Sequence, residues 1–445
     1  MKKKLMILML VFCAVPFIFA GGRGDQGKAS SGGGGIEITF CNMFNNPTAD
    51  ANSIAYTAQI EKFKRDYPNV KLIVESIPHD EYETKIKTYI SGGQYPDIFQ
   101  TKGTMIPQLA DDGVVYTARE VLSLVSGWEA QYKGGVFDDF TYKNTAYAIP
   151  FQMGNNHNIY WNSDIFKECG INEFPSDWNS FASAMDRIKA RGYTPIVQGN
   201  KGNWLVPSLL LNTIVYRYTG ADWYFSLREN KGAKFTDKPF VDALTLLQQM
   251  AQNGYFNTDI NSIDQHQMYT VYYNKKAAMM VDGFWGVGTF LNEMPKDVLN
   301  ATRIAQFPAV PESMGGGGAK YSKINQAASG WGYLTTKRRN DSPEKRAAMA
   351  QLLYYITGSD QAKIVVENGG LPASKPVGVD ESKLPPLYRE LLRLNNESQY
   401  APVFDVQLNP QVVDAFYANT QDLLINRMTP QRYAELIQTE MDKSR

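Results

Sequence analysis

The sequence predicts an α/β protein built from two lobes, each a β-sheet flanked by helices. Strand-like and helix-like segments alternate along the chain from Ile36 to about Ile364. This alternation is too long for one small sheet and favours two separate α/β sandwiches. The 445 residues suffice for two or three domains, and the 43% hydrophobic and 20% charged content is that of a globular chain.

The first part of the pattern alternates strands with amphipathic helices. A helix over 53–67 is predicted because Tyr56, Ile60 and Phe63 recur at helical spacing. The neighbouring segments are strands at 36–40, 70–74 and 96–99 and a helix at 80–90. Strand, helix, strand, helix, strand is the βαβ order of a parallel sheet.

A second series of segments continues the alternation further along the chain. Ser176 is expected to cap a helix that places Trp178 and Phe181 on one face, and Pro239 and Pro343 each open a further helix. The remaining segments are an extended stretch at 146–150, a strand at 158–161 and an apolar run at 277–281 that fits a buried strand.

The first 35 residues are expected to lie outside the fold. Residues 1–20 are a predicted signal peptide, because three lysines precede an apolar stretch too short to span a membrane. Residues 21–35 are a Gly-rich linker. Cys13 leaves a lipid anchor open, although the bulky Phe12 before it is unusual for one. We expect an exported protein, periplasmic or tethered to the outer face of the cytoplasmic membrane.

Composition and motifs argue against several classes of function. Removal of residues 1–20 takes away three lysines, so the net charge goes from 0 to about −3 and gives no reason to expect a nucleic-acid partner. The 3 histidines do not stand in HxH or HExxH spacing, and no GxSxG or Walker-type motif occurs. We therefore expect a protein that binds no metal or cofactor and that is not an enzyme. A disulfide between Cys41 and Cys169 stays open.

Four groups of short motifs follow one another at characteristic separations. They are GQYPDI at 93–98; YAIP at 147–150 with IYWNSDIF at 159–166 and PSDW at 175–178; KAAMM at 276–280 with GFW at 283–285; and GWG at 330–332 with LLYYI at 352–356 and GGLP at 369–372. Their order resembles that of the family 1 extracellular solute-binding proteins, the group that includes maltose-binding protein. The resemblance covers essentially the whole chain from Ile36. Trp161 replaces the family's usual Tyr, a departure that is conservative in kind.

The resemblance implies a two-lobe, periplasmic-binding-protein-like fold of type II, with mixed sheets flanked by helices and joined by hinge strands. We expect lobe one over 36–150 plus 325–397, lobe two over 151–312 plus 398–445, and a Gly-rich loop or crossover at 313–324. The resemblance also implies a sugar bound between the lobes, closure about the hinge, and delivery to the membrane permease subunits of an ABC importer. A monomer is the expected state.

Three tryptophans are candidates for stacking on the apolar C–H face of a sugar. Trp285 follows the predicted strand at 277–281. It lies between Gly283 and Gly286, and these glycines leave room for a ligand. The resemblance places a sugar-stacking Trp at this position. Trp331, in the GWG motif, and Trp204 match aromatic positions near the cleft of relatives.

Polar candidates lie at the ends of predicted strands, where ligands bind in open α/β sheets. Asn42 and Asn45 follow the first strand, and Thr101 and Lys102 follow the strand at 96–99. The other candidates are Asp282 beside the GFW motif, Gln152 and Asn155 after the hinge at Pro150, and Phe416 and Tyr417 on a C-terminal helix that supplies an aromatic residue to the cleft in relatives.

The sequence leaves alternatives open for both the role of the protein and its ligand. The same features suit a sensory module that presents its ligand to a chemoreceptor or a histidine kinase. The ligand has alternatives such as a polyol, glycerol phosphate or a small anion. Lys102 is the only cation among the candidates, and a phosphate needs Arg or Lys, so a neutral ligand is favoured.

Overall fold

The computed structural model describes residues 35–155 and 157–445. The predicted signal peptide, the lipidation alternative at Cys13 and nearly all of the predicted linker lie outside the described residues. Within the described ranges, no helix is long and apolar enough to cross a membrane.

The part of the chain from Ile36 onward forms one compact unit, and its described residues include two large hydrophobic cores. Each core lies beside its own sheet, so the two lobes predicted from the sequence are confirmed. Cys41 lies in one core and Cys169 in the other, both as free thiols. The disulfide that the sequence left open is therefore not formed.

Lobe one is built on a five-stranded sheet in the order β2-β1-β3-β13-β6. Its strands are β1 Ile36–Asn42, β2 Val70–Ser76, β3 Ile98–Thr101, β6 Ile149–Pro150 and β13 Gly332–Thr335. β1 pairs in parallel with β2 and β3, whereas β13 runs antiparallel between β3 and β6. The predicted βαβ order is confirmed, and the carboxyl ends of β1 and β3 meet the amino end of β13 at one sheet edge.

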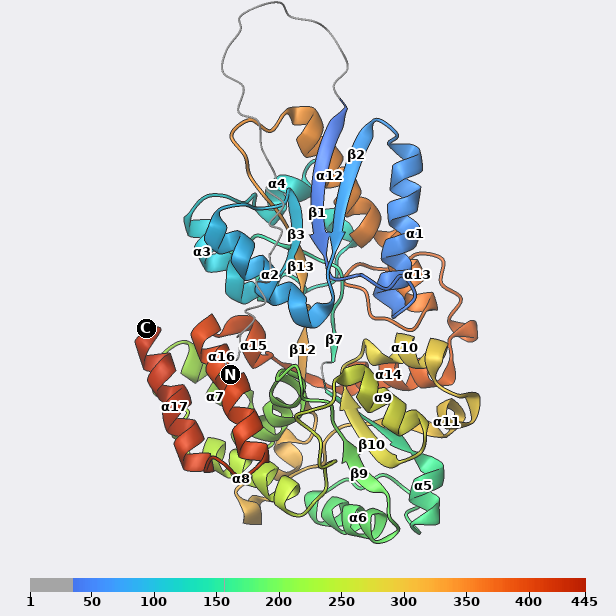
Figure 1. The fold of residues 1–445 in the computed structure, drawn as a ribbon, viewed down its shortest axis with the longest axis vertical. Coiled ribbons are helices and arrows are strands. Elements are labelled where there is room, and N and C mark those ends of the chain that lie inside the picture. Colours follow the sequence, from blue (N-terminus) through green and yellow to red (C-terminus); the bar gives the residue numbers. More distant parts are fainter. Residues whose placement is uncertain (1–34, 156) are drawn as a thin grey trace, which may run out of the picture. The chain divides into compact units, whose positions relative to one another are not determined.

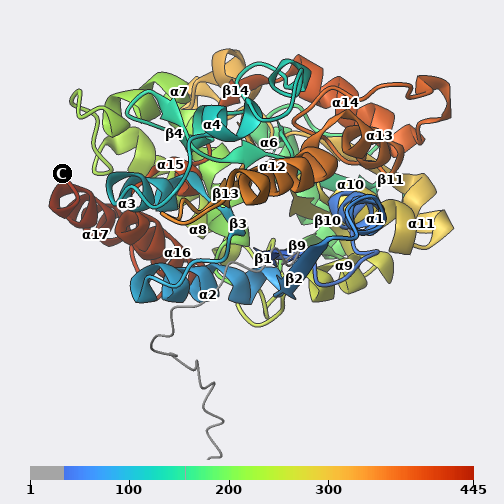
Figure 2. The same ribbon diagram turned by 90° about the horizontal axis from the view of Figure 1, so that it is seen from above.

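Helices cover both faces of this sheet. Figure 2 shows the strands between α12 on one face and α2 on the other, and α1 packs against α12 and α13. Asp50 begins α1, because its side chain accepts hydrogen bonds from the backbone N–H groups of Asn52 and Ser53 at 2.7 and 3.0 Å. The helices of lobe one are α1 Ala51–Asp66, α2 His79–Gly92, α3 Ile106–Asp111, α4 Ala118–Leu122, α12 Pro343–Thr357 and α13 Ser359–Glu367.

Lobe two is built on a four-stranded mixed sheet in the order β11-β8-β10-β9. The strands are β8 Asn158–Asn162, β9 Thr194–Val197, β10 Ala277–Asp282 and β11 Thr302–Ala305. β10 pairs antiparallel with β8 and parallel with β9, and every residue of β10 is buried. A central strand covered on both faces needs a continuous apolar run, and the run at 277–281 predicted this strand correctly.

Most of the remaining chain folds into helices around the second sheet (Figure 1). They are α5 Ser163–Glu168, α6 Trp178–Ala190, α7 Asn212–Arg228, α8 Lys238–Gln252, α9 Gln265–Tyr273, α10 Gly286–Glu293, α11 Lys296–Ala301, α14 Pro386–Glu397, α15 Phe404–Gln407, α16 Pro410–Leu424 and α17 Pro430–Lys443. The predicted cap at Ser176 is wrong by one residue. Asp177 caps α6 instead, because its carboxylate accepts a hydrogen bond from the Ser180 backbone N–H at 3.1 Å.

A small third sheet, ordered β14-β12-β7, lies where the chain passes between the lobes. Its strands are β7 Gly154–Asn155, β12 Ile324–Ala328 and β14 Gln399–Ala401. The chain leaves lobe one between β6 and β7 and returns between β12 and β13. One helix differs from the expected division: α14, assigned to lobe one from the sequence, packs against β11 and adds Leu387 and Leu391 to the core of lobe two. Its apolar stripe does not specify which sheet it meets.

Candidate functional site

A cavity of about 470 Å³ lies between the two lobes. This volume is within the range of small-molecule sites. Lobe one lines the cavity with the loop after β1, the start of α1, the start of α2, Lys102 and the residues around Trp331. Lobe two lines it with Trp204, the first turns of α9, Trp285 and Asp405. A ligand in this cavity therefore contacts both lobes.

The cavity lies at the ends of the strands that the two sheets direct toward it. The loop after β1 and Lys102 after β3 come from the carboxyl ends of parallel strands, and Trp285 follows β10. β13 runs antiparallel to β3, so Trp331 reaches the same edge from the amino end of its strand. The general placement of ligands in open α/β sheets thus accounts for these positions.

Aromatic rings from both lobes form a row along the cavity. Trp331 and His79 come from lobe one, and Trp204 and Trp285 from lobe two. The ring centroids are 6.0 Å apart for Trp331 and His79, 5.1 Å for His79 and Trp204, and 6.2 Å for Trp204 and Trp285. We call this set the aromatic row. Its ring faces offer apolar area beside polar groups, which suits an amphipathic ligand.

Gly283 determines where the Trp285 ring lies. A Cβ atom at position 283 would lie 2.3 Å from two carbon atoms of this ring. The sequence suggested that the glycines around Trp285 leave room for a ligand. At Gly283 the room is taken by the tryptophan itself, which folds back over its own backbone.

Hydrogen bonds across the cavity join the two lobes. Trp204 Nε1 donates to Asp80 Oδ1 at 3.3 Å. Thr289 Oγ1, on α10, donates to the Ala49 carbonyl oxygen at 2.8 Å. Both donors belong to lobe two and both acceptors to lobe one, so opening the cavity breaks both bonds.

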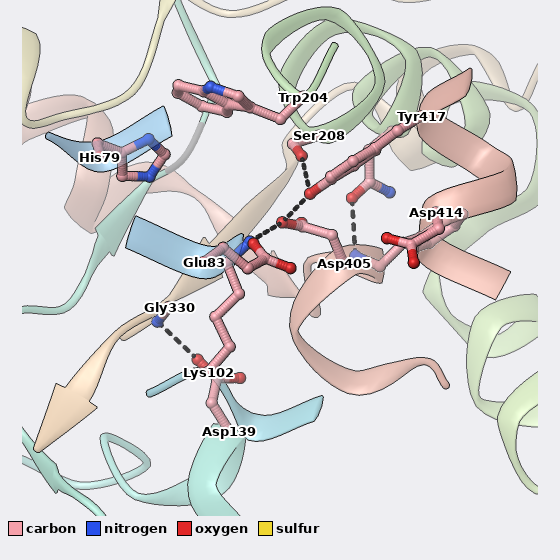
Figure 3. A network of polar contacts seen from close by, with 12 residues as sticks. His79, Glu83, Lys102, Asp139, Trp204, Ser208, Gly330, Asp405, Asp414 and Tyr417 are labelled. Atoms are coloured by element: carbon pink, nitrogen blue, oxygen red, sulfur yellow. Dashed lines mark hydrogen bonds and ion pairs between the residues drawn. The ribbon is translucent and has the colours of Figure 1, made fainter. Parts of the chain in front are cut away.

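A group of three charged side chains lies at one part of the cavity, and two of them, Lys102 and Asp405, line it (Figure 3). Lys102 Nζ lies 3.0 Å from Glu83 Oε2 in lobe one and 3.5 Å from Asp405 Oδ2 in lobe two. Burial lowers the pKa of Lys102, but the two carboxylates outweigh this effect and raise the pKa. Burial raises the pKa of Glu83, but Lys102 and Lys87 outweigh it and bring the pKa to about 2. Lys102 is therefore protonated and Glu83 ionised at neutral pH.

Amide groups supply further polar contacts at the cavity wall. Asn52 Nδ2 donates to Gln152 Oε1 at 2.8 Å, and Gln152 Nε2 donates to the Ser329 carbonyl oxygen at 3.4 Å. Asn45 lines the cavity and is exposed. Among the described residues, no group of three or more His, Cys, Asp or Glu side chains is placed to hold a metal ion.

Asp282 lies behind the cavity wall and fixes two residues that line it. Its carboxylate accepts hydrogen bonds from Gln265 Nε2 at 2.8 Å, from the Tyr269 hydroxyl and from the Gly283 backbone N–H at 2.8 Å. Burial raises the pKa of Asp282 to about 7, although these hydrogen bonds act to lower it. Its role in the structure is to orient Gln265 and Tyr269 rather than to line the cavity.

The cavity brings together about half of the candidates proposed from the sequence. Those that line it are Trp285, Trp331, Trp204, Gln152, Asn45 and Lys102. Their assignment as ligand contacts stays a prediction. Asp282 lies behind the wall.

The other candidates support the wall or lie away from it. Asn42 shapes the loop after β1, because its Oδ1 accepts a hydrogen bond from the Phe44 backbone N–H at 2.8 Å. Thr101 is buried in β3, and Asn155 in β7 donates to Ser398 Oγ at 3.3 Å. Phe416 and Tyr417 are buried in the core of lobe two, where the Tyr417 hydroxyl donates to Asp405 Oδ2 at 2.6 Å.

Several lining residues are absent from the sequence-based candidates. His79 and Asp80 follow β2, so the strand-end reasoning that selected Lys102 selects them as well. Gln265, on α9, and Asp405, on α15, carry no such signal, because only the packing of these helices brings them to the cavity.

The sequence profile of the bacterial extracellular solute-binding proteins matches residues 48–350. This chain belongs to that family. A multiple sugar-binding protein of Streptococcus mutans is 22% identical over 241 residues, which are 53% of this chain and 56% of the relative. The chain thus spans about half the length of this curated relative. The family is one of solute-binding proteins rather than enzymes.

Solved structures show the same fold for this family member. A chitin oligosaccharide binding protein has a TM-score of 0.82 at 20% identity, over 92% of this chain and 98% of that chain. A structure from work on xylan utilization by Caldanaerobius polysaccharolyticus has a TM-score of 0.81 at 24% identity, over 91% of this chain and 100% of that chain. The predicted two-lobe fold is confirmed.

Proposed function

We propose that this solute-binding protein captures a saccharide between its lobes and delivers it to the permease subunits of an ABC importer. The observation that carries the proposal is the aromatic row, to which each lobe contributes rings. Flat rings stack on the apolar faces of a sugar, and neighbouring amides and carboxylates bond its hydroxyl groups. The relatives support this ligand class, since one is named for sugars and another for chitin oligosaccharides.

Capture follows from closure of the two lobes over the ligand. In an open form the cavity is wet, and Trp204 and Trp285 are separated from the lobe-one side of the aromatic row. In the closed form a saccharide contacts both lobes at once, and the bond from Trp204 to Asp80 forms beside it. The ligand therefore favours closure by its higher affinity for the closed form.

Export and partners complete the proposal. The protein acts as a monomer outside the cytoplasmic membrane, either free or tethered. Its closed form, with both lobes in a fixed relation, is the form that the permease subunits recognise.

A thermal-shift screen of the purified protein against saccharides, polyols and phosphate esters tests the function. A ligand present at about 100 times its dissociation constant adds about 2.7 kcal/mol to the free energy of unfolding. For lobes of this size, we expect the unfolding midpoint to rise by about 5–10 °C with one class of saccharide. A rise with a polyol or a phosphate ester, and with no saccharide, would refute the proposal.

A further inference from the structure

The cavity that we assign to a saccharide carries more acidic than basic side chains. Its acidic lining residues are Asp50, Asp80, Asp264 and Asp405. Among the described lining residues, Lys102 is the single lysine or arginine. The electrostatic character of the site therefore depends on whether the charge of Lys102 is available to a ligand.

The charge of Lys102 is already taken up by its neighbours. Its Nζ atom lies 3.0 Å from Glu83 Oε2 and 3.5 Å from Asp405 Oδ2, and 5.1 Å from the centroid of the Trp331 ring. The Lys102 side chain is 7% exposed, so solvent screens these contacts little. Two carboxylates and an aromatic face thus occupy the positions from which an anionic ligand group would bind the ammonium.

One of these two carboxylates belongs to the opposite lobe. Glu83 lies on α2 of lobe one, whereas Asp405 lies on α15 of lobe two. Gly103 permits this approach, because a Cβ atom there would lie 2.6 Å from the Val406 carbonyl oxygen. The Tyr417 hydroxyl, at 2.6 Å from Asp405 Oδ2, holds the carboxylate in place (Figure 3). The pairing with Asp405 therefore joins a side chain of lobe one to a side chain carried by lobe two.

We propose that Asp405 determines the charge class of the ligand: by pairing with Lys102 across the closed lobes, it restricts the site to saccharides without negative charge. This inference rests on the proposed saccharide function and names its substrate class. A uronate or a sugar phosphate meets Asp50 and Asp80 on lobe one and finds the one lining lysine engaged. Burying an unpaired anion in such a site costs far more than burying a hydroxyl group.

The first test compares saccharides that differ only in a carboxylate. Isothermal titration calorimetry on the purified protein measures glucose against glucuronate and galactose against galacturonate, and the disaccharides of each against the corresponding acids. We expect every acid to bind at least about tenfold more weakly than its neutral partner.

The outcomes separate the two proposals. An acid that binds as tightly as its neutral partner overturns the inference and leaves the saccharide function standing. If neither neutral nor acidic saccharides bind while a polyol or phosphate ester does, the function itself falls and the inference falls with it.

The second test removes the residue that is held responsible. In the Asp405→Asn protein, the side chain keeps its shape but has no charge. We therefore expect the ratio of the affinity for a neutral saccharide to the affinity for its acid to fall about tenfold. Asp414→Asn is the matched control. Asp414 also pairs across the lobes, with Lys87 at 3.4 Å, but it is exposed and outside the cavity lining.

The unfolding midpoint of each variant shows whether it is folded. If the Asp405→Asn protein does not fold, Glu83→Gln provides the second variant, because it removes the other carboxylate beside Lys102. A folded variant whose ratio of neutral to acid affinity equals that of Asp414→Asn overturns the proposal.

Discussion

Replacing Trp285 with alanine is expected to weaken saccharide binding by about 30- to 60-fold. One face of a sugar ring stacked on an indole removes about 80–100 Å² of apolar surface from water. At about 25 cal/mol per Å², this contact contributes about 2–2.5 kcal/mol. Each 1.4 kcal/mol is a factor of about ten in the dissociation constant, which gives the expected range.

The same substitution is expected to leave the protein folded. Trp285 is half-buried. The centroid of its ring lies 6.2 Å from that of Trp204 and 5.5 Å from that of Phe284. Truncating a fully buried tryptophan costs about 3–5 kcal/mol of stability, and a half-buried ring that faces a cavity costs less, about 1–2 kcal/mol. The loss of affinity is therefore separable from the loss of stability.

Isothermal titration with the saccharide that gives the largest thermal shift measures the effect. Trp161→Ala is the control, because Trp161 is also half-buried in lobe two but packs on Phe166 and Phe174 outside the cavity lining. We expect the control to lower the unfolding midpoint and to leave the affinity within about twofold. If Trp285→Ala binds within about threefold of the unmodified protein, the stacking argument is wrong.

Three further predictions concern the surroundings of this ring. Gly283→Ala places a Cβ atom 2.3 Å from the Trp285 ring, so titration calorimetry should show at least about tenfold weaker binding; unchanged affinity would contradict the packing argument. Thr289→Val removes the hydrogen bond to the Ala49 carbonyl, which contributes about 1 kcal/mol. This variant should bind the saccharide about fivefold more weakly and be more open in small-angle scattering. A scattering curve like that of the unmodified protein would contradict the expected opening. The folded-state pKa of Asp282 is raised from 3.8 to about 7, so its contribution to stability is fully present below about pH 4 and is lost as the pH rises through about 7. Asp282→Asn should therefore gain in unfolding midpoint relative to the parent between about pH 5 and 8, and a constant difference would count against the raised pKa.

The sequence predicted best those features that depend on local pattern. The apolar run of β10 specifies a central strand whatever surrounds it, and the position of Trp285 just after that strand places its ring near the cavity. Lys102 was found in the same way, from the end of β3. Strand ends are local features of the chain, and the fold rule that uses them holds across open α/β sheets.

What the sequence could not supply depends on which helix meets which sheet. Tyr417 was a candidate because it lies on a C-terminal helix, but the packing of α16 turns it into the core of lobe two. Its hydroxyl instead holds Asp405, a residue without any local signal. An apolar stripe indicates that one face of a helix is buried, but it does not specify the sheet against which that face packs. The same holds for α14.

Two side chains that line the cavity also join the lobes, so we expect them to affect both ligand recognition and closure. Trp204 and Asp405 both line the cavity and both bond to lobe one, through Asp80 and Lys102. A ligand that leaves these contacts intact adds its own interactions to those of the closed form. A ligand that displaces one must replace a hydrogen bond worth about 1 kcal/mol, or more where charge is involved. If the lobes close over the ligand as we propose, discrimination is exerted at the closing step, because a ligand shifts the lobes only by its difference in affinity for the two forms. On this proposal, we expect an anionic saccharide to meet the open lobes and fail to close them.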